Sequence, residues 1–177
     1  MITRRTTRQI RVGDVPIGGD APIAVQSMTN TDTADTEATV AQIAQLAAAG
    51  CDLIRVAVPD TAAAAAISVI RAGITIPLIA DIHFDWRLAV AAMENGAQCI
   101  RINPGNIGGE KKLAKVVAAA RAHRVPIRVG VNSGSIEKDL LRAHGYPTPE
   151  NPKALIESAL RNVRLVEELG WEEIKIS

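Results

Sequence analysis

Apolar strand patterns alternate with helical patterns along almost the whole chain, and this alternation restricts the possible folds more than any other feature. The patterns typical of strands occupy residues 21–30, 52–59, 76–85, 99–105, 126–132 and 172–177. The patterns typical of helices occupy residues 36–50, 61–73, 86–96, 110–123 and 135–145, with a longer helix that starts at Asn151 as N-cap and Pro152 as first helical residue. Repeated strand–helix units with nearly continuous apolar strands predict a parallel α/β sheet covered by helices.

Two architectures fit this order, a doubly wound open sheet and a TIM (β/α)8 barrel. No G-x-G-x-x-G motif follows the first strand, which argues against a nucleotide-binding open sheet. Residues 8–23, RQIRVGDVPIGGDAPI, place a Gly-Asp turn between two short apolar segments. They predict an N-terminal β-hairpin at the bottom of a barrel, of which this chain supplies about the first six βα units.

Composition excludes several functional classes. Of the 177 residues, 47% are hydrophobic, which is typical of a folded domain, and a net charge of +1 gives no field that would attract nucleic acid or a membrane surface. The chain contains no apolar run near the ~20 residues of a membrane span and no secretory signal, so we expect a cytoplasmic protein. Cys51 and Cys99 precede or begin strands, where we expect small buried apolar side chains rather than metal ligands.

Four of the predicted strands carry a cation between two β-branched apolar residues. These cations are Arg55, Arg101, Arg128 and Lys175. Side chains alternate across a strand, so if the flanking residues pack under the helices, every cation points into the barrel. A single arginine in a strand is usually a structural ion pair or a rim residue, but four in the same local context indicate a shared function.

Other polar residues follow the same alternation. Asp81 and His83 are two residues apart, Asn103 shares the strand face of Arg101, and Asn132 that of Arg128. All lie toward the carboxyl ends of their strands, where parallel barrels build active sites. His83 by itself fits a hydrogen-bonded core histidine as well as a catalytic group, and the sequence leaves both readings open.

The cations outnumber the acids near them, because only Asp81 and Asp85 follow the same strand pattern. Unpaired buried charge is unfavourable, so an anionic ligand is expected to supply the missing negative charge. Arginine binds phosphate through a planar fork and lysine acts as a point charge, which favours a ligand with more than one phosphate group. The glycines of 105–109 and the loop 132–135 offer backbone donors.

Six motifs in this order resemble the 4-hydroxy-3-methylbut-2-enyl diphosphate synthases, the iron–sulfur oxidoreductases of the non-mevalonate (MEP) pathway of isoprenoid biosynthesis. They are VQSMTNTDT (25–33), IRVAVP (54–59), ADIHFD (80–85), RINPGNIG (101–108), RVGVNSGS (128–135) and IKIS (174–177). The resemblance extends over nearly the whole chain, from about Arg4 to Ser177.

The resemblance implies that residues 1–177 form an incomplete N-terminal TIM-barrel domain that binds the substrate, 2-C-methyl-D-erythritol 2,4-cyclodiphosphate. It also implies a C-terminal domain, absent from this chain, that holds a [4Fe-4S] cluster on three cysteines and one glutamate. Two electrons from ferredoxin or flavodoxin open the ring of the substrate and remove water. The family's enzymes are head-to-tail homodimers in which the cluster domain of one subunit covers the barrel of the other.

The resemblance also implies roles for individual residues. It places the diphosphate on Arg55, Arg101, Arg128 and Lys175, and the rest of the substrate on Asp81, His83, Asn103 and Asn132. Among these we expect Asp81 and His83 to be the catalytic groups, and we expect Ser177 to contact the substrate as well. No metal ligand is expected within this chain.

The sequence ends inside the sixth strand, whereas a TIM barrel needs eight. We therefore expect the 177-residue chain alone to be inactive. Two alternatives stay open: a non-catalytic diphosphate-binding module, and another phosphate-handling barrel enzyme such as a pterin synthase or an aldolase. An aldolase would need a Schiff-base lysine on a strand, and Lys175 is the candidate.

Overall fold

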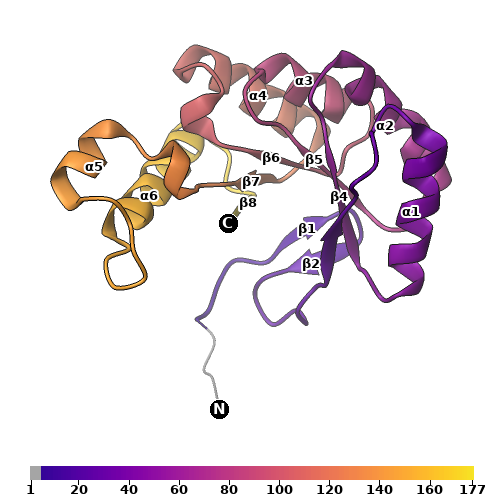
Figure 1. Ribbon diagram of the computed structural model, residues 1–177, viewed down its shortest axis with the longest axis horizontal. Helices are drawn as coiled ribbons and strands as arrows, with labels where there is room; N and C mark the ends of the chain where they lie inside the picture. Colours follow the sequence, from indigo (N-terminus) through magenta and orange to yellow (C-terminus); the bar gives the residue numbers. More distant parts are fainter. Residues whose placement is uncertain (1–4) are drawn as a thin grey trace.

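The computed structural model describes residues 5–177, so residues 1–4 of the predicted domain lie outside the described part. The main sheet has six strands, all parallel, in the order β3-β4-β5-β6-β7-β8. They are β3 (Gln26–Met28), β4 (Leu53–Ala57), β5 (Leu78–Asp81), β6 (Cys99–Ile102), β7 (Ile127–Val129) and β8 (Ile174–Ile176). Neighbours in sequence are neighbours in the sheet, and the sheet curls (Figure 1), so the predicted partial barrel is confirmed.

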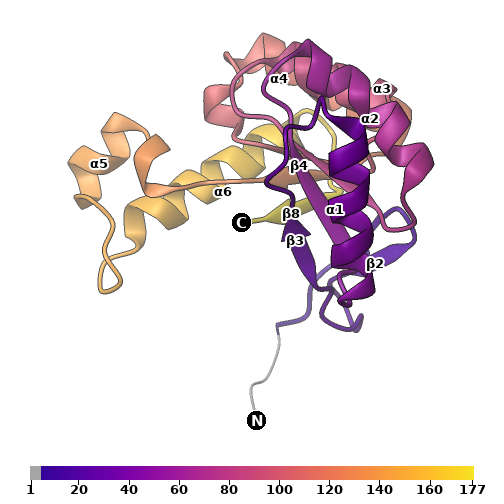
Figure 2. The same cartoon turned by 45° about the vertical axis from the view of Figure 1, so that its right-hand side comes forward.

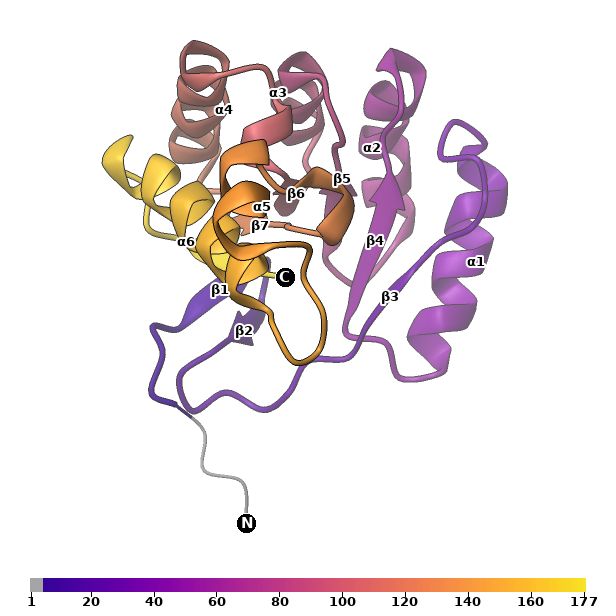
Figure 3. The ribbon, with the colours of Figure 1, turned by 60° about the vertical axis from the view of Figure 1, so that its left-hand side comes forward.

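Six helices connect these strands. They are α1 (Thr36–Ala48), α2 (Thr61–Gly73), α3 (Trp86–Glu94), α4 (Glu110–His123), α5 (Lys138–His144) and α6 (Lys153–Glu168). Helices α1 to α4 form an arc around the outside of the sheet (Figure 3), whereas α5 and the start of α6 project away from it (Figure 2). Within residues 5–177, no helix combines the length and the apolar character needed to cross a membrane.

Aspartate side chains fix the starts of three of the outer helices. Asp35, Asp60 and Asp85 are the N-cap residues of α1, α2 and α3, and each side chain accepts a hydrogen bond from a first-turn backbone N–H. Such caps satisfy donors that have no partner within the helix, and each stabilises its helix by about 1 kcal/mol. The three caps therefore fix the point at which the loops before α1, α2 and α3 end. All three loops lie on the same side of the barrel.

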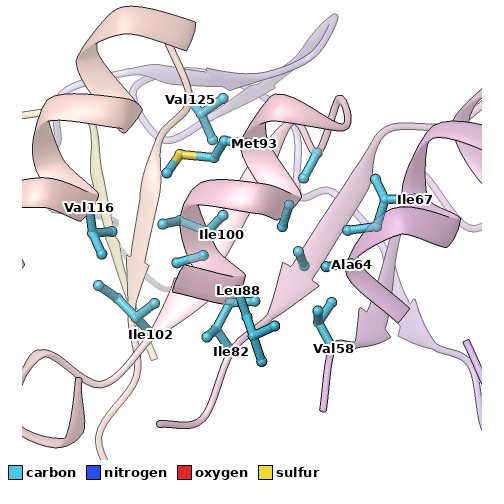
Figure 4. Packing of buried hydrophobic residues seen from close by; sticks show 14 of the residues in the cluster. Val58, Ala64, Ile67, Ile82, Leu88, Met93, Ile100, Ile102, Val116 and Val125 are labelled. Carbon is cyan, nitrogen blue, oxygen red and sulfur yellow. The ribbon is translucent and has the colours of Figure 1, made fainter. Parts of the chain in front are cut away.

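The core lies between the sheet and the helices (Figure 4). The β-branched residues that flank three of the strand cations are fully buried there: Ile54, Val56, Ile100, Ile102, Ile127 and Val129. Ile174, which precedes Lys175, packs against the same cluster. Because these residues face the helices, the cations between them face the interior of the curled sheet, as predicted.

The predicted N-terminal hairpin is confirmed as β1 (Ile10–Val12) and β2 (Val15–Ile17), an antiparallel pair. Its Val12 packs with Leu53, Ile79 and Cys99, which begin or lie low on the strands of the main sheet. The hairpin therefore covers the N-terminal end of the barrel interior with apolar side chains. Cys51 and Cys99 are both buried and unpaired, as expected, and burial raises the pKa of the Cys99 thiol to about 12.

All six strands are shorter in the structure than the sequence patterns predicted, and two boundaries move because of local side-chain hydrogen bonds or caps. Strand β5 ends at Asp81 rather than at residue 85, because Asp85 serves as the N-cap of α3. Helix α6 begins at Lys153 with Pro152 at the N-cap position. Asn151 does not cap it, because its side chain donates a hydrogen bond to the backbone oxygen of His144, at the end of α5.

Candidate functional site

The sheet register brings the strand cations together. Asp81, Arg101, Arg128 and Lys175 occupy paired positions on the four successive strands β5 to β8. Residues paired in a parallel register point to the same face of the sheet, so these four side chains form one row on the inner face. Arg55 reaches the same row from β4, because its Nε lies 3.5 Å from the Asp81 carboxylate. The predicted gathering of the four cations is confirmed.

Asp81 is the carboxylate around which the cluster is organised. The residue is only 4% exposed. Its Oδ1 lies 3.3 Å from Nη1 of Arg101, and its Oδ2 lies 3.5 Å from Nε of Arg55 and 3.9 Å from Nε2 of His83. Asp81 therefore holds Arg55 and Arg101 in position beside each other.

The other two cations have no such counter-charge. Neither Arg128 nor Lys175 forms an ion pair with any residue from 5 to 177. The buried Nε of Arg128 also finds no acceptor within that range. Burial, reinforced by the neighbouring charges of Arg128 and Arg55, lowers the pKa of Lys175, and burial followed by the charge of Arg55 lowers that of Arg128. This half of the row therefore carries positive charge that the described residues do not neutralise.

Strand β3 contributes two side chains that the sequence reasoning missed. Gln26 Oε1 accepts a hydrogen bond of 2.7 Å from Nη1 of Arg128, and Met28 Sδ lies 3.2 Å from Nε of Arg55. The alternation of side chains along a strand could have identified this pair, because Gln26 and Met28 are two residues apart and so share a face of their strand.

His83 lies beyond the end of β5, not within the strand as predicted. Its side chain is 51% exposed, and its ring centroid is 6.1 Å from that of the exposed Phe84. The core-histidine reading is therefore wrong. The imidazole stands at the rim, with its Nε2 3.9 Å from Asp81 Oδ2 and about half of the side chain open to solvent.

Asn103 and Asn132 occupy equivalent places at the ends of β6 and β7. Each is the N-cap of a short 3-10 helix, η1 (Pro104–Asn106) and η2 (Ser133–Ser135), and each side-chain oxygen accepts from the glycine N–H two residues on. Ser135 joins them, since its Oγ lies 2.8 Å from Asn103 Nδ2 and 3.2 Å from Asn132 Oδ1. The side chains of Asn103 and Asn132 therefore hold the loops that contain η1 and η2 in place. Ser135 links these two loops, and the sequence reasoning did not identify its side chain.

Ser177 extends the pairing of β8 with β7. Its N–H donates to the oxygen of Val129, and its oxygen accepts from the N–H of Val131, both at 2.9 Å. Strand alternation places its side chain on the same face as Lys175. The residue is exposed.

Residues 5–177 do not fit an iron–sulfur cluster. Across residues 5–177, no group of three or more histidine, cysteine or acidic side chains is placed to hold a metal. A [4Fe-4S] cluster is usually held by four cysteine thiolates, whereas this chain has two cysteines, both buried, and Cys99 lies under the N-terminal hairpin.

Comparison with known proteins agrees with this geometry. A model of the GcpE TIM-barrel domain matches residues 7–177. The chain belongs to the GcpE TIM-barrel family. The resemblance drawn from the six sequence motifs is thereby confirmed, and the alternative of an open sheet is excluded.

Curated relatives in the GcpE family share high identity with this chain. A protein of Desulfotalea psychrophila named 4-hydroxy-3-methylbut-2-en-1-yl diphosphate synthase (flavodoxin) is 68% identical over 177 residues, which are 100% of this chain and 49% of the relative. A protein of the same name from Geobacter sulfurreducens is 60% identical over 171 residues, 97% of this chain and 48% of the relative. The chain thus spans about half the length of the curated relatives it matches.

Solved structures show a similar fold at low identity. Dihydropteroate synthase from Xanthomonas albilineans superposes with a TM-score of 0.63 at 20% identity, covering 96% of this chain and 64% of that one. The enzyme from Vibrio fischeri gives 0.67 at 13% identity, covering 96% and 66%. At such identities the likeness establishes the barrel fold of this GcpE domain and nothing about its substrate.

Proposed function

We propose that this chain is the substrate-binding barrel of a 4-hydroxy-3-methylbut-2-en-1-yl diphosphate synthase. Such an enzyme converts 2-C-methyl-D-erythritol 2,4-cyclodiphosphate to 4-hydroxy-3-methylbut-2-enyl diphosphate by a two-electron ring opening and dehydration. The observation that carries the proposal is the row of Arg101, Arg128 and Lys175, with Arg55 beside it, where Asp81 is the only carboxylate in ion-pair contact among residues 5–177. A diphosphate supplies the negative charge that this row lacks.

The four cations bind the diphosphate oxygens, and the rim residues contact the rest of the substrate. Arg128 and Lys175, which have no ion-pair partner within residues 5–177, offer the stronger attraction, while Asp81 orients Arg55 and Arg101. Asn103, Asn132 and Ser177 contact the rest of the substrate at the carboxyl ends of the strands. His83 and Asp81 are the groups placed to hold or move a proton there.

The reaction class needs electrons that no residue of this row supplies. In such an enzyme a [4Fe-4S] cluster would supply them. Residues 5–177 do not fit such a cluster, so its ligands would come from another part of the synthase. The names of the relatives point to flavodoxin as the donor rather than ferredoxin. A cytoplasmic homodimer, with the cluster domain of one subunit over the barrel of the other, completes the proposal.

The first experiment measures pyrophosphate binding to the 177-residue chain by titration calorimetry. Arg101→Ala removes charge-assisted hydrogen bonds, so we expect the Kd to rise roughly tenfold or more. Arg161→Ala, which breaks an exposed ion pair between α6 and Asp139 of α5, is the matched control and leaves binding unchanged. No pyrophosphate binding by the folded parent chain would overturn the proposal.

Turnover is tested in a chimera in which this chain replaces the matching half of the Desulfotalea psychrophila relative. Reduction of the cyclodiphosphate by the reconstituted chimera distinguishes an enzyme barrel from a non-catalytic binding module. A folded, cluster-loaded chimera that binds pyrophosphate without turnover would favour the module.

The lowered pKa of Lys175 keeps an aldolase as a second candidate, because a Schiff base forms from a neutral amine. Borohydride trapping of a carbonyl substrate, lost in Lys175→Ala, is the result that would favour it. We expect no trapping, because burial next to Arg128 and Arg55 explains the lowered pKa without a carbonyl partner.

A further inference from the structure

Gly130 is the first residue after β7 and lies directly beneath the Arg101 side chain. If Gly130 carried a methyl group, its carbon would lie 2.2 Å from Nε, 2.6 Å from Nη2 and 2.7 Å from Cζ of Arg101. These separations are far shorter than van der Waals contact, so the guanidinium occupies the space of the missing side chain. The backbone of Gly130 does not need the left-handed region, because its φ is not among the positive values of this chain. Space, rather than conformational freedom, explains a glycine here.

The position of Arg101 is fixed from two sides. Its Nη1 lies 3.3 Å from Asp81 Oδ1 on β5, while its guanidinium rests over Gly130 beside β7. Gly130 itself is held to β6, because its N–H donates to the oxygen of Ile102 at 2.8 Å. Gly130 therefore has little room to move away from an added methyl group, whereas the far end of the arginine side chain is flexible.

We propose that Gly130 is a positioning residue that sets the place of the Arg101 guanidinium and thereby the affinity of the cluster for diphosphate. The proposal rests on the proposed function, since it concerns the same anion-binding row. Any side chain at position 130 lifts Arg101 off the β7 backbone and separates it from Asp81. The row of cations then keeps its net charge, but the guanidinium of Arg101 is no longer oriented to donate two parallel N–H groups to a phosphate.

Titration calorimetry with pyrophosphate tests this in a cycle of variants. Gly130→Ala is expected to fold and to weaken binding about as much as Arg101→Ala, roughly tenfold or more. The double variant Gly130→Ala/Arg101→Ala should bind no more weakly than Arg101→Ala alone, because the methyl group then has nothing to displace. Gly73→Ala, at the end of α2, is the matched control, since the three heavy atoms nearest to its added methyl group all belong to the side chain of Val40 and not to the row of cations. Losses that multiply in the double variant would overturn the proposal.

A second readout does not depend on binding. The Nε–H resonance of Arg101 in 15N NMR, assigned by its disappearance in Arg101→Lys, reports the environment and solvent exchange of the guanidinium. In Gly130→Ala we expect the resonance to shift and to exchange faster with water. If the parent chain fails to bind pyrophosphate, the proposed function fails, and this resonance still decides the role of Gly130. An unchanged resonance would refute that role, as would loss of folding in Gly130→Ala with Gly73→Ala intact.

Discussion

Gln26 on β3 accepts a hydrogen bond from Arg128 on β7, with 2.7 Å between Oε1 and Nη1, although β4, β5 and β6 lie between the two strands. Only a curled sheet allows this contact, because strands in a flat sheet are about 4.8 Å apart and these two are four positions apart. The bond therefore crosses the barrel interior. It also holds Arg128, which has no ion-pair partner in residues 5–177, in line with the other cations.

This contact predicts opposite effects on stability and binding. Gln26→Glu places a carboxylate against Arg128, which neutralises the cation. We expect a higher Tm at low salt and a Kd for pyrophosphate raised about tenfold. Thermal unfolding and calorimetry measure the two effects. Gln45→Glu, on the exposed side of α1, adds the same charge away from the row and changes neither value. Tighter pyrophosphate binding by Gln26→Glu would remove Arg128 from the anion site.

Asp81→Asn is expected to lower the free energy of unfolding by about 1–3 kcal/mol, because two partly buried arginines lose their shared carboxylate. Pyrophosphate should restore part of the loss, since a ligand that binds the folded chain stabilises it by mass action. Urea unfolding with and without pyrophosphate measures both changes.

The control for this variant is Asp139→Asn, which breaks the exposed ion pair with Arg161. Such surface pairs contribute about 1 kcal/mol or less, and pyrophosphate should have no selective effect there. Equal losses in the two variants, with no rescue of Asp81→Asn, would contradict the organising role of Asp81.

Cys99 predicts a fall in stability in alkaline solution. Burial raises the pKa of its thiol from 9.0 to about 12, so between these values the unfolded chain releases the proton and the folded chain keeps it. Well below pH 9 both states are protonated and the group contributes no pH dependence. Above it, the free energy of unfolding falls by up to about 1.4 kcal/mol per pH unit.

Urea unfolding of the parent chain and of Cys99→Ala from pH 8 to pH 10.5, about the range over which the unfolded thiol ionises, isolates this contribution. Lysines and Tyr146 are common to both proteins, so their titration cancels in the difference. The free energy of unfolding of the parent chain minus that of Cys99→Ala should shrink as the pH rises. The variant lacks the packing of the thiol at every pH, whereas the parent chain loses stability through ionisation of the unfolded thiol only in the upper range. Parallel curves would place Cys99 in contact with water.

His83 is expected to affect turnover more than affinity. Its imidazole is half-exposed at the rim, 3.9 Å from the Asp81 carboxylate, and is not one of the four cations of the row. In the chimera described above, His83→Ala should lower kcat by about a hundredfold, the usual range for a lost general acid or base, with KM nearly unchanged. The reverse pattern, a raised KM with kcat intact, would make His83 a binding residue only.

Local patterns in the sequence carry much of this architecture. The period-two alternation around Arg55, Arg101, Arg128 and Lys175 predicts both the buried faces and the inward cations, because a strand has only two faces. The order of strands and helices predicts parallel neighbours for the same local reason. The prediction fails where two signals compete at one residue: Asp85 continues the apolar run of β5 by position, yet its carboxylate caps α3.

The sequence by itself determined the strand faces, the family and the gathering of cations at one end of a barrel. Only the tertiary structure decided which cations are neutralised, through Asp81 at 3.3 Å from Arg101 and 3.5 Å from Arg55. It alone placed Gln26 against Arg128 and Gly130 under Arg101. Contacts of this kind depend on curvature, register and side-chain reach between segments as much as 102 residues apart, and no local pattern encodes those distances.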